Sequence, residues 1–169
     1  MFARSLQLQP PSSQHAYKLS LMHRIEQGLS GLDVLLEGIA HERFHQPLPN
    51  SPWSVHEHLA HLGRCHEIEL DRMDRIVFDD TPPQFETPNM ETDEGFVAWT
   101  HMPTGGILKE LSALRQRLLE RLARLQDDDL ERLGFHGTLG PMPLKQWLEL
   151  FLAHEGHVFY FIFCSLRGH

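Results

Sequence analysis

Cysteine is scarce in this sequence, and the two that occur, Cys65 and Cys164, stand far apart. They form no Cys-x-x-Cys pair, which argues against a disulfide-stapled scaffold and against a zinc ribbon. Such sparse cysteine fits a reducing compartment, and we therefore expect a cytoplasmic protein. The N-terminal segment also lacks the continuous apolar core and the small-residue cleavage site of a signal peptide.

Basic residues are outnumbered, since 15 Lys and Arg stand against 23 Asp and Glu and the formal charge is −8. The sequence has no basic run, so nucleic-acid binding, which depends on clustered Lys and Arg, is not expected. Long hydrophobic runs are missing as well. The most apolar stretch, residues 144–164, is interrupted by charged and polar side chains, whereas a membrane span needs roughly 20 nearly uninterrupted apolar residues. This stretch is typical of a buried helix.

Apolar residues recur at helical spacing in four segments, and no segment alternates with the period of two that is typical of strands. The pattern predicts an all-α fold, a four-helix bundle, with a long loop at residues 79–106 in which residues 96–100 form a helical turn. A long loop of this kind often covers or lines a site. We expect a flexible N-terminal arm at 1–16 and a single domain at 17–169. The expected helices are 17–40, 54–78, 107–126 and 143–166.

The start of the second expected helix is well marked. Ser54 is followed three residues later by Glu57, which forms a capping box. Trp53, directly before the cap, can pack against His58 or a neighbouring helix. In the third expected helix the leucines form the buried stripe, and the arginines, Arg115 among them, are expected to face solvent.

Histidine is abundant, with 13 in the chain. His61 is predicted to face the core from the second helix, while His154 and His157 lie on or beside the apolar stripe of the fourth. A single histidine on an apolar face is usually a core residue with a hydrogen-bond partner. Two histidines on one helix and a third that faces inward from another helix can instead bind zinc, nickel, copper or iron, with one coordination position of the metal left open. The histidines expected at the surface are His15, His23, His41, His45, His56, His66 and His169.

Two parts of the sequence resemble a known family. Residues 53–62, Trp-Ser-Val-His-Glu-His-Leu-Ala-His-Leu, are similar to the WSxxExlxHL opening of the second helix in the DinB/YfiT-like superfamily. Residues 141–144 and the His-Glu-Gly-His at 154–157 resemble its last helix, which usually carries His-x-x-x-His or His-x-x-His-His. The resemblance extends from about residue 20 to 166. It implies a bundle with a divalent metal, held by one second-helix histidine and by two last-helix histidines at i and i+4.

The sequence departs from that pattern at the third ligand. His61 and His154 match the family positions, but the i+4 position on the last helix is Val158. His157, at i+3, is the candidate substitute, because residues at i and i+3 can both reach one ion. We therefore predict His61, His154 and His157 as the metal ligands, with zinc, nickel or iron as the metal.

Several neighbouring residues have competing interpretations. Cys65, one turn after His61, could approach the metal, although a small buried thiol is the expected role. Glu155 is interpreted as a solvent-facing charge rather than as the partner of a ligand. For a general base the sequence offers only weak candidates, which are His58, His101 and Asp93.

The resemblance implies a metal-dependent transferase, isomerase or hydrolase, with a small-molecule substrate and in some members a low-molecular-weight thiol. A metal with an open position polarises a carbonyl or stabilises a thiolate or hydroxide. The alternative is a non-catalytic dimeric or small-molecule-binding bundle whose metal site has decayed at Val158. A third interpretation is a structural metal site, which needs a fourth protein ligand such as Cys65. The resemblance also implies homodimers, expected through the first and third helices.

Overall fold

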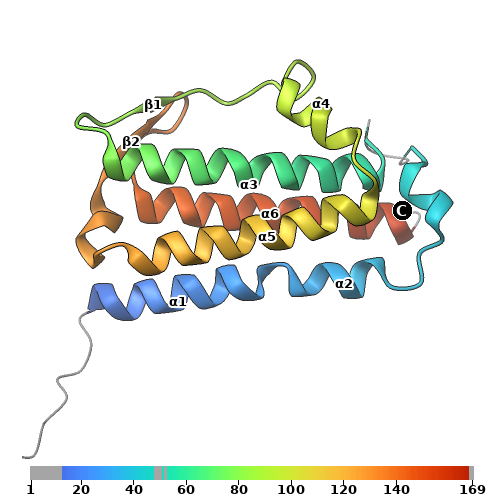
Figure 1. Cartoon of the computed structure of the whole chain (residues 1–169), viewed down its shortest axis with the longest axis horizontal. Helices are drawn as coiled ribbons and strands as arrows, with labels where there is room; N and C mark the ends of the chain where they lie inside the picture. The colour runs from blue at the N-terminus through green and yellow to red at the C-terminus, as the bar shows by residue number, and fades with distance from the viewer. Residues whose placement is uncertain (1–12, 48–50, 52, 168–169) are drawn as a thin grey trace, which may run out of the picture.

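The computed structural model describes residues 13–47, 51 and 53–167. Residues 1–12 of the expected N-terminal arm lie outside this part of the chain. The helices are α1 (Ser13–Gly28), α2 (Ser30–Leu36), α3 (Val55–Phe78), α4 (Glu94–Thr100), α5 (Thr104–Arg124) and α6 (Leu144–Arg167), with short 3-10 helices η1 (His41–His45) and η2 (Asp127–Glu131). The pair α1–α2 runs beside α5 and α6, and α3 packs against both α5 and α6 (Figure 1). This is the predicted four-helix bundle.

The first predicted helix, residues 17–40, is two helices interrupted at Leu29. The interruption follows Gly28, where a Cβ atom would lie 2.4 Å from Glu155 Oε1 and 3.2 Å from Arg115 Nη1. Side chains from α6 and α5 therefore approach the backbone closely at Gly28, where the absence of a Cβ atom leaves them room. The prediction of one continuous helix is therefore wrong, and the interruption lies between Gly28 and Gly31, two residues of low helix propensity.

The second bundle helix begins as predicted. Ser54 Oγ accepts a hydrogen bond from the Glu57 N–H, and the Glu57 carboxylate accepts one from the Ser54 N–H at 2.7 Å. Such a cap contributes about 1 kcal/mol. The Trp53 ring packs edge-on against His58 at 5.5 Å between centroids. Within the described residues, no helix combines the length and the apolarity that crossing a membrane demands.

A small three-stranded sheet lies at one end of the bundle, where the sequence predicted no strands. Its strands are β1 (Gln84–Phe85), β2 (Leu133–His136) and β3 (Gly140–Pro143), in the order β1-β2-β3. The pair β1–β2 is parallel and the pair β2–β3 is antiparallel. Strands of two to four residues are too short to display an alternating pattern, and β2 also contains a Gly and β3 a Gly and two Pro.

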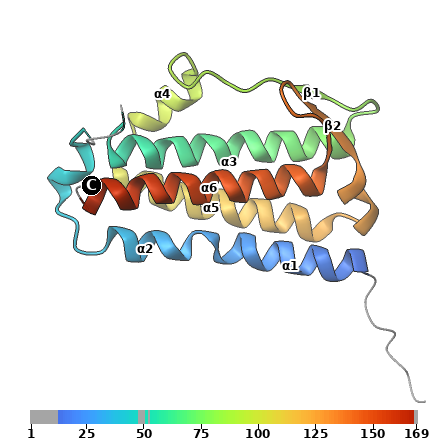
Figure 2. The same cartoon turned by 180° about the vertical axis from the view of Figure 1, so that it is seen from behind.

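The predicted long loop crosses the outer side of α3 and carries β1 and α4 (Figures 1 and 2). We call residues 79–103 the cover segment. The helical turn expected at 96–100 is confirmed as part of α4. A Cβ atom at Gly63 of α3 would lie only 2.3 Å from the Trp99 ring, so the absence of a side chain at Gly63 lets α4 pack directly on the helix. The cover segment is thereby held against the bundle.

Candidate metal centre

Two of the predicted ligands meet between α3 and α6. The Nε2 atoms of His61 and His154 lie 3.1 Å apart, and the ring planes are inclined at 74°. Burial lowers the pKa of both imidazoles, that of His61 to about 4; the neighbouring His154 lowers the pKa of His61 further, and His157 and Arg72 lower that of His154. Both rings are therefore neutral near pH 7, which is the form of imidazole that binds a metal.

Cys65 is the third member of this group. It follows His61 by one turn of α3, and its Sγ lies 3.7 Å from Nε2 and 3.8 Å from Nδ1 of His61. Ligand atoms of His61, Cys65 and His154 all lie within 4.8 Å of one another. Burial raises the pKa of the Cys65 thiol to about 12, so a metal ion would displace the thiol proton when it binds. We call these three residues the His–Cys group.

Two of the three distances in the His–Cys group are close to those around one tetrahedral ion. Zinc bonds of about 2.0–2.1 Å to nitrogen and about 2.3 Å to sulfur place two tetrahedral nitrogens about 3.3 Å apart, and nitrogen and sulfur about 3.6 Å apart. The observed separations are 3.1 Å between the two nitrogens and 3.7 Å from the Cys65 sulfur to His61 Nε2. Three protein donors leave a fourth position open, which is the arrangement of catalytic rather than structural zinc.

His157, the predicted third ligand, lies outside the His–Cys group. Its side chain is exposed on α6, and its ring packs edge-on against Phe161 at 4.7 Å. Val158, at the family's usual ligand position, is a core residue that is 3% exposed. The structure thus brings together His61 and His154 of the predicted set and adds Cys65, while ligation by His157 stays a prediction.

A cavity of about 280 Å³ opens beside the His–Cys group. All three members of the group line it, and α3 and α6 also contribute apolar walls such as Ile68 and Phe151. The cover segment closes one side with Thr87, Pro88 and Met90. The long loop therefore lines this cavity, and that the cavity is a functional site stays a prediction.

Glu69 is a functional candidate that sequence reasoning missed. It lines the cavity one turn after Cys65 and is only 2% exposed. Burial raises the pKa of its carboxyl to about 8, against the opposing effect of the positive charge of Arg72. Its Oε1 has no hydrogen-bond partner among the described residues. The available signal was spacing, because His61, Cys65 and Glu69 recur every four residues and so share one face of α3.

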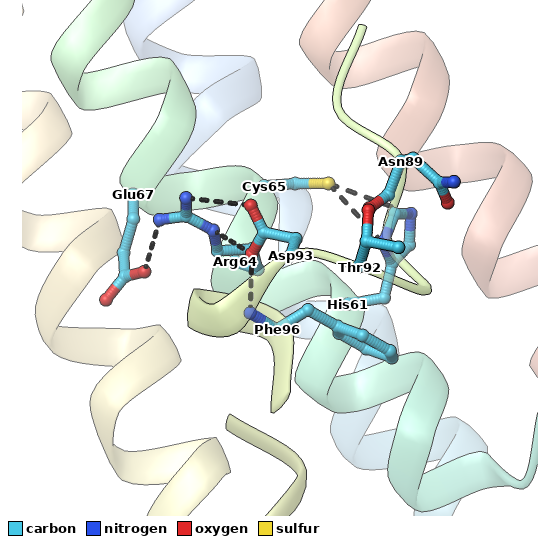
Figure 3. A network of polar contacts seen from close by, with 8 residues as sticks. All are labelled: His61, Arg64, Cys65, Glu67, Asn89, Thr92, Asp93 and Phe96. Carbon is cyan, nitrogen blue, oxygen red and sulfur yellow. Dashed lines mark hydrogen bonds and ion pairs between the residues drawn. The ribbon is translucent and has the colours of Figure 1, made fainter. Parts of the chain in front are cut away.

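The cover segment is fastened to α3 beside His61. Arg64 donates from Nε to Asp93 Oδ1 at 2.7 Å and from Nη2 to Oδ2 at 3.1 Å (Figure 3). Asp93 in turn caps α4 by accepting a hydrogen bond from the Phe96 N–H at 2.6 Å. The rings of Trp53 and Phe96 lie 5.0 and 6.3 Å from the His61 ring. These aromatic rings restrict the access of water to one side of His61.

The three residues considered as general bases are engaged elsewhere. Nε2 of His58 lies 3.0 Å from Ser51 Oγ, and the exposed His101 donates from Nδ1 to the Val97 carbonyl. Asp93 holds the cover segment through its two carboxylate oxygens. None of these three residues lines the cavity, so their geometry gives them structural roles.

His56, which was expected at the surface, is only 5% exposed. Its Nε2 donates to the Thr100 carbonyl at 3.0 Å, so its Nδ1 is the acceptor for the Thr104 hydroxyl at 2.8 Å. The surface prediction is wrong because these two partners lie on α4 and α5, far away in the sequence. His56 joins three helices.

Arg115, Glu155 and His66 form a second buried polar cluster, where solvent-facing side chains were predicted. Arg115 is ion-paired with Glu155 and also donates to the Ile25 carbonyl at 2.8 Å. His66 donates from Nδ1 to the Leu62 carbonyl at 2.7 Å, and burial lowers its pKa to about 3. The helical pattern of one segment could not reveal these burials, since each ionic partner comes from another helix. His169, the last of the predicted surface histidines, lies outside the described residues.

Comparison with known proteins places the chain in a family. The profile of the DinB superfamily matches residues 24–157. The chain belongs to the DinB superfamily. It is 23% identical over 136 residues to the uncharacterized protein YuaE of Bacillus subtilis, in an alignment that covers 71% of this chain and 81% of that protein.

The fold is similar to that of YfiT from Bacillus subtilis, with a TM-score of 0.75 and 20% sequence identity. The superposition covers 94% of this chain and 90% of that chain. YfiT is described as a probable metal-dependent hydrolase with an unusual four-helix bundle topology. The likeness confirms the predicted bundle topology. This DinB-superfamily bundle thus contains a His–Cys group that could hold a metal ion.

Proposed function

We propose that this chain is a metal-dependent enzyme of the hydrolase, transferase or isomerase type, with zinc, nickel or iron held by His61, Cys65 and His154. The observation that carries the proposal is the convergence of these three donors, whose ligand atoms lie within 4.8 Å of one another, on the wall of a 280 Å³ cavity. Membership of the DinB superfamily and the fold shared with a probable metal-dependent hydrolase agree with it.

The bound metal would supply a Lewis acid for a carbonyl group or for a low-molecular-weight thiol. The chain's own side chains would do the remaining work. Glu69 holds a proton near neutral pH, because burial raises its pKa to about 8, and it can pass that proton to a ligand in the cavity. Trp53 and Phe96 cover His61 and limit the entry of water.

The deciding experiment is elemental analysis of the untagged protein, stripped with a chelator and resupplied with zinc, nickel or iron. We expect near-stoichiometric metal in the wild type and its loss in His61→Ala, Cys65→Ser and His154→Ala. His101→Ala removes an exposed histidine remote from the cavity and serves as the control that should retain metal. The wild type, and any variant that retains metal, are then screened with hydrolytic and thiol-transfer substrates.

His157→Ala decides between the two candidate third ligands. If the metal is lost in His157→Ala and kept in Cys65→Ser, the ligand set is His61, His154 and His157, and the role proposed for Cys65 is refuted. A wild-type protein that takes up no metal after resupply refutes the metal-dependent enzyme altogether. The histidines would then be core residues of a non-catalytic, small-molecule-binding bundle.

A further inference from the structure

Arg72 brings a positive charge into the cavity, two turns along α3 from Cys65. Its side chain is 16% exposed and lines the cavity. The guanidinium lies over the Trp147 ring at 5.0 Å and near the Phe85 ring at 5.7 Å. Stacking of this kind fixes the plane of the guanidinium and leaves the N–H groups at its edge available to a ligand.

The contacts of Arg72 leave much of its hydrogen-bonding capacity unused. Nη2 makes a long hydrogen bond of 3.4 Å to the Glu86 carbonyl, and Nη1 is 4.0 Å from Glu69 Oε2, which is beyond hydrogen-bond range. Arg64 on the same helix is better paired, because it contacts two carboxylates at 2.7 and 3.1 Å. Arg75 lies 3.6 and 3.9 Å from two carboxylates. Arg72 differs from both in lining the cavity.

Glu69 makes only the 4.0 Å contact with Arg72, and burial favours the uncharged form of its carboxyl. Its Oε1 is buried and without a hydrogen-bond partner among the described residues. A buried polar atom of this kind costs free energy until a partner arrives. A ligand that accepts from Arg72 can also contact Glu69, because both side chains line the same cavity.

His136 adds a second donor to the cavity wall. The backbone N–H groups of Thr138 and Leu139 both donate to its Nδ1, at 3.1 and 3.2 Å. Nδ1 is therefore the acceptor nitrogen, and in the neutral ring Nε2 carries the proton. The ring lies 5.4 Å from the Trp147 ring, on which Arg72 also stacks, and both His136 and Arg72 line the cavity. The two backbone hydrogen bonds thus leave Nε2 of His136 as an N–H donor on the wall of the cavity.

We propose that the cavity binds a small carboxylic acid whose carboxylate is held by Arg72 and His136. The apolar body of this ligand lies along Trp147 and Phe151, and its other end reaches the His–Cys group. Seven residues of helix, or about 10 Å, separate the backbones of Cys65 and Arg72, a span that suits an aryl or short alkyl acid. The inference names a substrate class for the proposed function and rests on that function only for the view that the ligand is a substrate.

The test compares 3-phenylpropanoate with its uncharged amide, 3-phenylpropanamide, by calorimetric titration of chelator-stripped protein. Stripping the protein ensures that no carboxylate binds through a metal. We expect the wild type to bind the carboxylate at least tenfold more tightly than the amide, since a charge-assisted guanidinium contact is available only to the carboxylate. Arg72→Gln should lose this preference. Arg75→Gln, on the same helix but outside the cavity lining, is the matched control and should keep it.

Arg72→Lys guards against a simple folding defect, because it keeps the charge and should keep part of the preference. No carboxylate preference in the stripped wild type overturns the proposal, and so does a preference that Arg72→Gln retains. If the preference appears only after zinc is added and disappears in His154→Ala, the carboxylate binds the metal. The inference then fails while the proposed function stands. A preference that depends on Arg72 in a protein that takes up no metal supports the inference and refutes the proposed function.

Discussion

The buried ion pair between Arg115 and Glu155 is expected to be among the most sensitive points of the fold. The two side chains are 5% and 4% exposed. Changing Glu155→Gln keeps the shape but leaves the guanidinium in the interior with neutral partners, the new amide and the Ile25 carbonyl. Breaking one half of a buried pair costs about 3–5 kcal/mol. With a urea dependence of about 2 kcal/mol per molar, the unfolding midpoint should fall by roughly 2 M.

Urea unfolding followed by circular dichroism measures this change. The matched control is Arg117→Gln on the same helix, where the pair Arg117–Glu110 is about half exposed and should cost less than about 1 kcal/mol. A double variant, Arg115→Met with Glu155→Leu, removes both charges and should recover most of the loss. The reasoning is refuted if Glu155→Gln costs no more than Arg117→Gln, because the buried charge would then be solvated in some other way.

Three further changes test the cavity and its cover. Glu69→Gln should gain stability relative to wild type as pH rises from 4.5 to 8, by up to about 4 kcal/mol. The reason is that the Glu69 carboxyl of the wild type releases its proton in this window only in the unfolded state. Parallel wild-type and variant curves of urea-unfolding free energy against pH would contradict this. Gly63→Ala should cost about 1–3 kcal/mol in thermal unfolding, since its Cβ meets the Trp99 ring. The control Gly31→Ala, which has open space around its Cβ, should be neutral or stabilising by about 1 kcal/mol. Asp93→Ala should cost about 1–2 kcal/mol and speed amide exchange in α4 alone; faster exchange throughout the bundle would count against a local role.

The long bundle helices could be predicted because each repeats its apolar spacing over many turns. The helix expected at 54–78 is found at Val55–Phe78, and the one expected at 107–126 is found at Thr104–Arg124. Each additional turn with an apolar residue on the same side strengthens the prediction of a helix and of its buried face. The capping box marks the start of α3. The small sheet offers no comparable repetition, because each of its strands is only two to four residues long.

The buried charges could not be predicted for a different reason. A helical pattern shows which face of one segment is apolar, but the burial of Arg115 depends on Glu155 of α6. The same holds for His56, whose partners Thr100 and Thr104 stand far from it in the sequence. The cost of burying such a group is offset only by a partner from another element. Without the three-dimensional arrangement, the surface is the reasonable expectation for each of these residues.

Helix geometry explains why Cys65, and not His157, lies beside His61 and His154. His157 and Val158 are neighbours on α6 and therefore point about 100° apart. Val158 is packed in the core, and this packing sets the rotation of α6 and leaves His157 exposed. On α3 the four-residue step from His61 to Cys65 is about 400°, only about 40° more than one turn, so both side chains stay on one face. If the proposed ligand set is correct, valine at position 158 is compatible with a three-donor site because the missing donor is supplied by α3 instead of α6.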